Sequence, residues 1–292
     1  MEPEVLSSSL RGGTILTVAE GVSGMTDTSR PRPETGWDPS QYQRFEGERD
    51  RAAQDLLARL PADMTPREIW DLGSGLGRHA IQLSRRHTRA AVHGLDSSRA
   101  MLERARAAGP DVDWRLGDLA DWGPEVPADL IFANASLQWV PDHAALFPRL
   151  IDALAPGGVI AVQMPMAHES LHHTLMREVA GRGPWSGRLS GVGTIAPLLS
   201  PEAYYDLLAR DCAGIDIWST RYLHVLEGPD PVLEWMKGTA LRPYLSALRD
   251  DPATGAAFLS ALGARLAEAF PARPDGATLL PFPRLFLVAR RR

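Results

Sequence analysis

One stretch of the chain, residues 68–79 with the sequence EIWDLGSGLGRH, constrains the fold most strongly. An apolar run at 69–72 predicts a buried strand, and Gly73, Gly75 and Gly77 follow it. Glycine has no Cβ, so the backbone can turn tightly there and approach a bound ligand closely. The helix expected directly afterwards would direct its amide N–H groups at whatever lies over the turn. This stretch therefore predicts a strand–turn–helix unit that binds a polar or anionic group of a nucleotide-like cofactor.

The spacing of these glycines distinguishes two classes of nucleotide-binding fold. It is G-x-G-x-G preceded by Asp71, and not the G-x-G-x-x-G pattern of dinucleotide-binding proteins. It resembles the first motif of the methyltransferases that use S-adenosylmethionine (SAM) and have a Rossmann-like fold. Because glycine-rich turns also occur in ordinary loops, the assignment depends on the segments that follow.

Composition and charge argue against several other classes of protein. The chain has 292 residues, of which 44% are hydrophobic and 23% charged, as is typical of a globular protein. The formal net charge of -5 argues against a general nucleic-acid-binding protein, which needs a basic face. We see no apolar run of the ~20 residues that span a membrane and no secretory signal. We therefore expect a cytoplasmic protein, and a monomer because no long apolar stripe is apparent.

The first 36 residues differ in composition from the rest of the chain. They are rich in Ser, Gly, Thr, Pro and Arg and have no sustained hydrophobic period, which predicts a disordered N-terminal extension. Order is expected to begin at Trp37, and a helix is predicted through Phe45 to Leu60. Trp37 and Tyr42 would either pack against the core or form a flap over the cofactor.

Strand and helix patterns alternate from the glycine turn to residue 165. Such alternation predicts a mostly parallel, twisted sheet with helices on both faces and right-handed crossovers. We assign residues 37–165 to a Rossmann-like core. The expected strands lie at 68–72, 90–96, 112–116, around 130–133 and at 159–164, and the expected helices at 78–86, 98–108 and from 142 through 154.

Two acidic residues at strand ends are candidate contacts to the nucleoside of the cofactor. Asp96 lies roughly 20 residues beyond the glycine turn, where nucleotide-binding folds place the carboxylate that binds the ribose hydroxyls. Asp96 could instead cap the next helix, since Ser97 and a second serine follow it. Asp118 and Leu119 follow the third strand, and in SAM enzymes these positions contact adenine, although Asp118 could be an ordinary loop residue. Met101 could cover one face of the adenine ring.

The fourth strand is followed by the run Asn-Ala-Ser-Leu-Gln-Trp at 134–139. Ligands of open α/β sheets bind beyond the carboxyl ends of the strands, so these side chains are expected in the cleft. Gln138 and Trp139 are expected to align the reacting groups, although Trp139 could also be a core residue. The cofactor-binding candidates are Tyr42, Asp71, Gly73, Ser74, Gly75, Gly77, Asp96, Ser97, Met101, Asp118, Leu119, Asn134, Ala135, Ser136 and Trp139.

The simple alternation ends after Pro165. A loose segment at 181–200 predicts a lid over the site. We assign residues 166–277 to this lid and a helical cap that includes one core strand, and residues 278–292 to the last strand. The cap, inserted before the last strand, is where we expect substrate specificity to be built. The expected helices lie at 171–179, 201–208, 231–237, 241–248 and 256–270, and the expected strands at 215–225 and 285–289.

Several stretches between Trp37 and the C-terminus match a single family of enzymes. They are WDPSQY at 37–42, DLGSGLG at 71–77, GLDSS at 94–98, IFANASLQW at 131–139, VQMP at 162–165, MREV at 176–179, AYYDL at 203–207, IDIW at 215–218, LRPY at 241–244 and PFPRLF at 281–286. In these stretches the chain resembles the trans-aconitate 2-methyltransferases. It departs from them in residues 1–36, in the glycine-rich lid and at Ser74, where we expect cysteine.

The resemblance implies that SAM donates a methyl group to a carboxylate of trans-aconitate, giving a monomethyl ester and S-adenosylhomocysteine. A carboxylate is already ionised at pH 7, so direct in-line transfer needs alignment and no general base. Cations and hydrogen-bond donors would bind the carboxylates that do not react. The candidates for this role are Gln163, Arg177, Tyr204, Tyr205, Arg242, Tyr244 and Arg284.

Four histidines, His143, His168, His172 and His173, are candidate metal ligands. His168 and His172 are four residues apart, but the segment lacks the H-E-x-x-H pattern of a zinc helix. We therefore expect no metal, and we favour a position for one of these histidines near the substrate carboxylates.

Three other functions stay open at this stage. The protein could methylate another small acid or a natural-product scaffold, or bind SAM without catalysis. It could also be an NAD-dependent oxidoreductase, because Asp96 would bind that ribose equally well. The oxidoreductase is disfavoured because Lys237 is the only lysine and no Tyr-x-x-x-Lys pair is present. Stabilisation against heat by SAM, and not by NAD, would distinguish these classes.

Overall fold

The structure is a computed structural model that describes residues 46–193 and 196–292. All of these residues belong to one compact unit, Gly36–Arg292. The expected N-terminal extension and the expected positions of Trp37 and Tyr42 lie outside the described residues.

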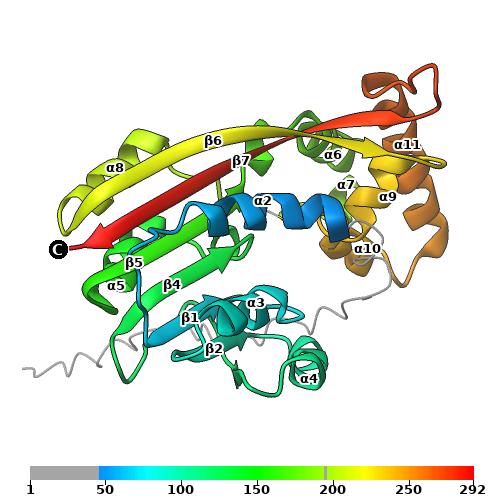
Figure 1. The fold of residues 1–292 in the computed structure, drawn as a ribbon. Coiled ribbons are helices and arrows are strands. Elements are labelled where there is room, and N and C mark those ends of the chain that lie inside the picture. Colours follow the sequence, from blue (N-terminus) through cyan, green and yellow to red (C-terminus); the bar gives the residue numbers. More distant parts are fainter. Residues whose placement is uncertain (1–45, 194–195) are drawn as a thin grey trace, which may run out of the picture. The chain divides into compact units, whose positions relative to one another are not determined.

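A seven-stranded sheet forms the centre of the described part of the chain, in the order β3-β2-β1-β4-β5-β7-β6 (Figure 1). Strands β1 to β5 are parallel, whereas β7 is antiparallel to both of its neighbours. The mostly parallel sheet predicted from the alternating pattern is therefore confirmed. The strands are β1 (Glu68–Leu72), β2 (Ala91–Asp96), β3 (Asp113–Leu116), β4 (Ala128–Asn134), β5 (Leu154–Pro165), β6 (Cys212–Leu226) and β7 (Thr278–Arg291).

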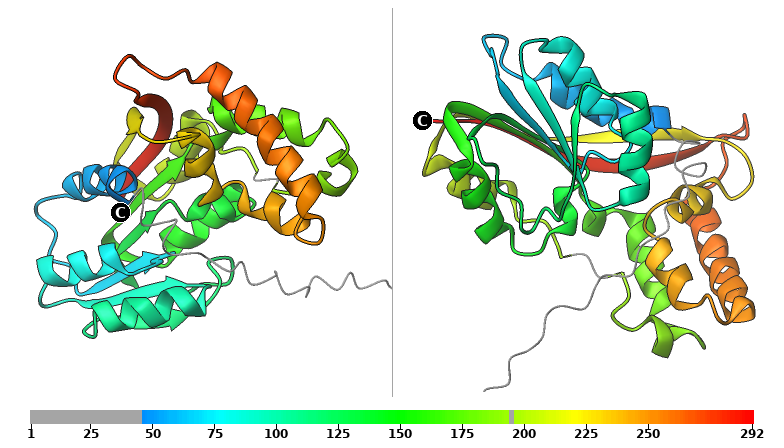
Figure 2. Two further views of the ribbon diagram at one scale, coloured as in Figure 1. Left: turned by 90° about the vertical axis from the view of Figure 1, so that its right-hand side faces the viewer. Right: turned by 90° about the horizontal axis from the view of Figure 1, so that it is seen from below.

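Helices cover both faces of this sheet (Figure 2). Side chains alternate between the faces along a strand, so Ile69 packs on one side and Trp70 on the other. One face is covered by α2 (Glu46–Ala58), α3 (Arg78–Arg86) and α4 (Arg99–Ala108), and the other by α5 (His143–Asp152) and α8 (Pro201–Ala209).

The remaining helices form a separate apolar cluster with the adjoining ends of β6 and β7, and we call this part the cap (Figure 1). Leu226, Leu280 and Phe282 of the two strands are buried in this cluster. The cap helices are α6 (Leu171–Ala180), α7 (Ser186–Leu189), α9 (Pro231–Lys237), α10 (Arg242–Ala247) and α11 (Pro252–Ala269). Helix α8, which the prediction grouped with the cap, packs on the core instead.

Three segments differ from the sequence prediction. The helix expected to pass through Leu154 ends at Asp152, and β5 begins at Leu154, which is fully buried. Strand β7 runs from Thr278 to Arg291 and not only through 285–289, because its whole length pairs with β6. The segment expected to be loose contains the short helix α7.

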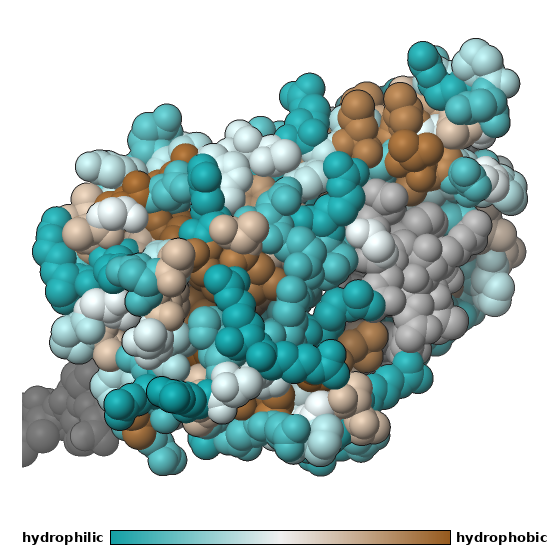
Figure 3. Space-filling model, in the orientation of Figure 1, coloured by the Kyte–Doolittle hydropathy of each residue, from teal (hydrophilic) through white to brown (hydrophobic). Residues whose placement is uncertain are grey.

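Strand β6 forms one edge of the sheet. Its residues Leu223 and Val225 are exposed, although most large apolar residues of the described part are buried. Figure 3 shows an apolar patch on this side of the molecule, over the part of β6 and β7 nearest the cap. The rest of the visible face is predominantly hydrophilic.

Candidate active site

The glycine turn between β1 and α3 has the conformation that its sequence predicts. Gly73, Gly75 and Gly77 have positive φ angles of 78°, 55° and 81°. The N–H groups of residues 73 and 74 donate to the carbonyl oxygen of Leu95 at 2.8 and 2.9 Å, which fixes the turn against β2. A Cβ on Gly73 would lie 2.3 Å from Cβ of Ser136, whereas one on Gly75 would meet nothing within 4 Å. The turn is therefore tightly packed at Gly73 and open at Gly75.

Four buried polar atoms at the carboxyl ends of β1 and β4 have no hydrogen-bond partner among the described residues. They are Oδ2 of Asp71, Oγ of Ser74, Oδ1 of Asn134 and Oε1 of Gln138. Burial raises the pKa of Asp71 to about 6, and nearby His79 opposes that rise. Buried polar atoms normally have hydrogen-bond partners, so these four atoms are suited to bind a polar ligand.

Asp96 joins the glycine turn to the start of α4. Its Oδ2 accepts from the N–H of Gly75 at 2.8 Å, and its Oδ1 accepts from the N–H of Ser98 at 2.8 Å. Burial raises the pKa of Asp96, and these N–H groups oppose that rise. The N-cap of α4 is the side chain of Ser98, which accepts from the N–H of Met101. Asp96 therefore contacts the start of α4, which was one of the two roles expected for it. It also lies beside Gly75, where the turn is open.

The other candidates near the nucleoside lie in different environments. Met101 is buried and Ser97 is exposed. Asp118 is also exposed, and its Oδ1 accepts from the N–H of Ala120 at 2.9 Å. Leu119 is half-buried against the core. Contact of these four side chains with a nucleoside stays a prediction.

The run after β4 is fixed by short local hydrogen bonds. Ala135 has a φ of 53°, and Oγ of Ser136 donates to the carbonyl oxygen of Leu72 at 2.6 Å. Nε2 of Gln138 donates to the carbonyl oxygen of Ala135 at 2.7 Å. The run continues into the short 3₁₀ helix η1 (Leu137–Trp139). These bonds orient two side chains toward one cavity, Asn134 before the turn at Ala135 and Ser136 and Gln138 after it.

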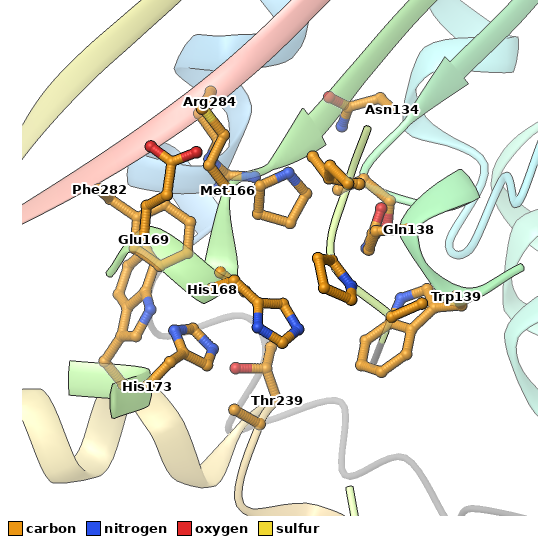
Figure 4. Close-up of a pocket in the computed structure, with 18 residues that line it drawn as sticks. Asn134, Gln138, Trp139, Met166, His168, Glu169, His173, Thr239, Phe282 and Arg284 are labelled. Atoms are coloured by element: carbon orange, nitrogen blue, oxygen red, sulfur yellow. The ribbon is translucent and has the colours of Figure 1, made fainter. Parts of the chain in front are cut away.

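This cavity has a volume of about 310 Å³ and extends from the run after β4 to the cap. Gln138 and Trp139 lie on one side of it, and His168 and His173 lie across from them (Figure 4). The residues labelled in the figure are Asn134, Gln138, Trp139, Met166, His168, Glu169, His173, Thr239, Phe282 and Arg284. We call this space the first cavity.

A second cavity of about 390 Å³ lies among the cap helices. Arg177 of α6 and Tyr244 of α10 line it. It shares a wall with the first cavity, formed by Trp139, Ala167, His168, His173 and Ala240. The two spaces therefore adjoin beside Trp139 and the two histidines.

Two of the candidate arginines reach these cavities. Arg284 of β7 lines the first cavity with only 5% of its surface exposed, and its Nη1 lies 3.5 Å from Oε1 of the fully buried Gln163. Arg177 lines the second, where its Nη2 donates to Oγ1 of Thr174 at 3.1 Å and to the carbonyl oxygen of His168 at 3.3 Å. A polyanion in the adjoining cavities would meet a guanidinium in each.

Four candidates for substrate binding line neither cavity, and one of them, Gln163, contacts Arg284. Tyr204 is fully buried in the core, where its hydroxyl lies 2.5 Å from Nδ1 of His143. Tyr205 is 53% exposed on α8. Arg242 is half-buried at the start of α10. The expectation placed the tyrosines with the cap, but α8 packs on the core, so they point elsewhere.

Several lining residues were not among the candidates. His168 and His173 were considered as metal ligands, with a position of one of the four histidines near the substrate carboxylates as the favoured alternative. Met166, Glu169, Thr239 and Phe282 were not singled out. His168 and Glu169 lie in the 3₁₀ helix η2 (Ala167–Glu169), directly beyond the carboxyl end of β5. The rule that ligands bind beyond strand ends could have identified this segment. Thr239 could not have been found in that way, because it comes from the cap.

The described residues contain neither a metal-binding cluster nor a membrane-spanning helix. In residues 46–193 and 196–292, no group of three or more His, Cys, Asp or Glu side chains is arranged to hold a metal ion. No helix in these segments is both long and apolar enough to cross a membrane.

Comparisons with known proteins agree with this geometry. Residues 69–158 match a family model described as a methyltransferase domain. A trans-aconitate 2-methyltransferase of Azoarcus sp. (strain BH72) is 49% identical over 255 residues, which cover 87% of this chain and 99% of that protein. The enzyme of the same name from Methylobacterium radiotolerans is 48% identical over 258 residues, covering 87% and 98%.

Solved structures show the same fold at low sequence identity. The YcgJ protein of Bacillus subtilis has a TM-score of 0.52 at 11% identity, with 82% of this chain and 97% of that chain covered. Phosphoethanolamine N-methyltransferase 2 of Haemonchus contortus, in complex with S-adenosylhomocysteine, has a TM-score of 0.50 at 19% identity, covering 82% and 52%.

The strand order, the glycine turn and the site at the carboxyl ends of β1 and β4 define a SAM-dependent methyltransferase with a Rossmann-like fold. The chain belongs to the trans-aconitate 2-methyltransferase family, which it matches from the core through the cap at close to half identity.

Proposed function

We propose that the protein transfers a methyl group from SAM to a carboxylate of trans-aconitate, giving a monomethyl ester and S-adenosylhomocysteine. One observation of the structure carries this proposal. A single cavity connects the run at 134–139, beyond the carboxyl end of β4, to the buried guanidinium of Arg284. Two relatives that cover 87% of this chain at 48–49% identity are named trans-aconitate 2-methyltransferase.

The residues at the ends of β1, β2 and β4 fit SAM. The space above Gly75 is open, and Asp71, Ser74 and Asn134 each have a buried oxygen without a hydrogen-bond partner in the described structure. We propose that these groups hold the cofactor together with Asp96, and that Asp118 and Met101 lie along its nucleoside. Tyr42 keeps its proposed role from the sequence. SAM supplies an electrophilic methyl group to this site.

The chain's own contribution to the reaction is alignment. The acceptor carboxylate is ionised at pH 7 and therefore needs no general base. Gln138 and Trp139 line the first cavity on the run that follows β4, so we propose that they position the reacting oxygen. Met166 and Phe282 give the first cavity an apolar part of its wall, and an apolar surrounding favours a reaction in which charge is lost. Precise positioning of this kind accounts for a large part of the rate of such transfers.

The carboxylates that do not react need cationic partners. Guanidinium groups bind carboxylates through paired, charge-assisted hydrogen bonds. We propose that Arg284 binds one of these carboxylates in the first cavity and Arg177 another in the second. Tyr244, which lines the second cavity, would donate a further hydrogen bond.

We further propose that the enzyme is a cytoplasmic monomer and works without a metal ion. The single cysteine, Cys212, which is buried, is consistent with a reducing compartment.

A larger acid is the second candidate substrate. The second cavity of about 390 Å³ adjoins the first, so an acid with an extended substituent would have room in the cap. This alternative keeps the same fold, cofactor and reaction.

The experiment that tests both candidates is incubation of the protein with SAM and a panel of acids, read by mass spectrometry for a gain of one methyl group. The panel contains trans-aconitate, cis-aconitate, citrate, isocitrate and larger branched dicarboxylates. We expect trans-aconitate to be methylated well above the other acids. Preference for a larger acid would support the alternative. Absence of methylation throughout, despite heat stabilisation by SAM, would overturn both.

A further inference from the structure

His173 is a buried imidazole at the junction of the two cavities. It lies on α6, is only 8% exposed, and lines both spaces. Figure 4 shows it beside His168, across the first cavity from Trp139. Its Nδ1 is buried and has no hydrogen-bond partner among the described residues. An imidazole so placed, with an unused polar atom beside a cavity, is suited to contact a ligand there.

Its surroundings keep this imidazole neutral in the absence of a ligand. Burial, together with repulsion of a positive charge by Arg177, His168 and Arg284, lowers the pKa of His173 to about 4. Glu169 lines the first cavity but is exposed to solvent. On its own helix α6 the other titratable and charged groups are His172, Arg177 and Glu178. On the neighbouring elements they are His168 and Glu169 of η2, His224 of β6, Arg284 of β7, the ion pair Glu234 and Lys237 of α9, and the exposed pair Arg265 and Glu268 of α11.

An acid with several carboxylates would instead favour the protonated form of His173. Arg284 and Arg177 line different cavities, whereas His173 and His168 line both. A carboxylate at the junction would therefore lie beside His173. Its negative charge would offset the two guanidinium groups, which disfavour protonation of His173. An opposite charge within a few ångströms favours the charged form of such a group by about 1–3 pK units. Imidazolium also donates from both nitrogens, which would give Nδ1 a partner.

We propose that His173, as an imidazolium, binds a carboxylate group that does not receive the methyl group. The acid and one proton therefore bind together. This proposal rests on the proposed function, because it deepens the account of the same site. His173 acts here in substrate binding and takes no part in the transfer of the methyl group. The acid then binds more weakly as the pH rises, by up to about tenfold per pH unit once His173 must take its proton from solution.

The decisive experiment measures proton uptake when the acid binds. Calorimetric titration of trans-aconitate into the protein loaded with S-adenosylhomocysteine is performed at pH 5.5, between the pKa of about 4 of the free protein and the value expected in the complex, in two buffers of different ionisation enthalpy. The wild-type chain, His173→Asn, His173→Gln and the control His168→Asn are compared. The free acid contributes the same proton equilibrium in every case, so the differences between the proteins report on the histidines alone.

We expect the wild-type chain to take up as much as one proton more than His173→Asn. His173→Asn should raise KM for trans-aconitate about tenfold or more while kcat changes less than threefold. His173→Gln retains a hydrogen-bond donor but cannot be protonated, so it should recover part of the affinity without the proton uptake. His168→Asn, altered in the same cavity wall, should keep the uptake.

Other results would overturn the proposal. Equal proton uptake in wild type and both His173 variants would exclude a bound imidazolium, and loss of uptake only in His168→Asn would assign it to the other histidine. If both His173 variants lost S-adenosylhomocysteine binding and thermal stability together, the residue would be structural. Failure of the proposed function can be told apart from failure of the His173 proposal. In that case the wild-type chain itself would neither bind nor methylate trans-aconitate.

Discussion

The guanidinium carbon of Arg284 lies 4.4 Å from the ring centroid of Phe282, two residues earlier on β7. Residues two apart on a strand project from the same face, so β7 presents a cation and an aromatic ring together to the first cavity. Both side chains are almost fully buried. A cation held beside a ring at the wall of a cavity fits the carboxylate-binding role proposed for Arg284.

Replacement of Arg284 by methionine should weaken binding of the acid and leave the cofactor site intact. A charge-assisted hydrogen bond contributes about 1.5–3 kcal/mol, so we expect KM for trans-aconitate to rise about 10- to 100-fold. Initial-rate kinetics and titration with S-adenosylhomocysteine measure the two effects. Arg242→Ala is the matched control, because Arg242 lines neither cavity and its loss should leave KM unchanged. A KM raised equally by both changes would contradict this assignment.

Two glycines of the same turn should respond differently to alanine. Both have a positive φ, which costs alanine roughly 1–2 kcal/mol. Gly73→Ala would also place its Cβ 2.3 Å from Cβ of Ser136, whereas Gly75→Ala would meet no atom within 4 Å. We therefore expect Gly73→Ala to lower the free energy of unfolding by more than Gly75→Ala. Urea denaturation of the two variants measures this difference, and equal losses would show that the turn can shift away from Ser136.

The buried carboxyl of Asp71 should make stability depend on pH. Burial raises its pKa from 3.8 to about 6, so its contribution to stability is fully present below pH 4 and is lost as the pH rises through 6. The shift corresponds to something on the order of 3 kcal/mol. Asp71→Asn should remove this loss, and the variant without cofactor should be more stable than the wild type at pH 8. Denaturation curves between pH 4 and 8 test whether stability falls as the pH rises. A wild type that is more stable than the variant at pH 8 would contradict the prediction.

The same variant should separate stability from cofactor binding. Oδ2 of Asp71 has no hydrogen-bond partner in the described structure, and we propose that SAM supplies one. Asp71→Asn should therefore bind S-adenosylhomocysteine more weakly although it is more stable. Unchanged affinity would remove Asp71 from the cofactor site.

Tyr204→Phe should affect the fold and not the reaction. Burial lowers the pKa of His143, and its Nε2 lies 2.9 Å from the carbonyl oxygen of Leu137. The neutral ring therefore donates through Nε2 and accepts the Tyr204 hydroxyl at Nδ1. Loss of the hydroxyl leaves a buried acceptor unpaired, which costs about 1–3 kcal/mol. Thermal denaturation should show this loss while KM for trans-aconitate stays unchanged. A raised KM would place Tyr204 in the site after all.

The core of the fold could be predicted because its signals are local. The glycine turn depends on backbone conformations that only a few neighbouring residues determine, and α3 begins and ends at Arg78 and Arg86 as expected. The start of β5 was missed because Leu154 is apolar and buried in either a helix or a strand. Periodicity cannot distinguish the two for such a short run.

The substrate side of the site depends on tertiary packing and was predicted less well. Arg284 and Arg177 reach the cavities, but Tyr204 and Tyr205 do not, because α8 packs against α5 and not against the cap. With many arginines and several histidines in the chain, residue type alone could not select the ones that line a cavity. His173 was distinguishable from His172 only by its position at the cavity wall, since the two are adjacent in sequence.

Strands β6 and β7 are paired along their length, and Leu226 at the end of one is the register partner of Thr278 at the start of the other. The chain thus leaves the sheet and returns to it at neighbouring points. Topologically, helices α9, α10 and α11 are the tip of one long β-hairpin. Changes of length within such a tip leave the pairing of its strands in place. Helices α9, α10 and α11 can therefore change in length while the paired strands of the core keep their geometry.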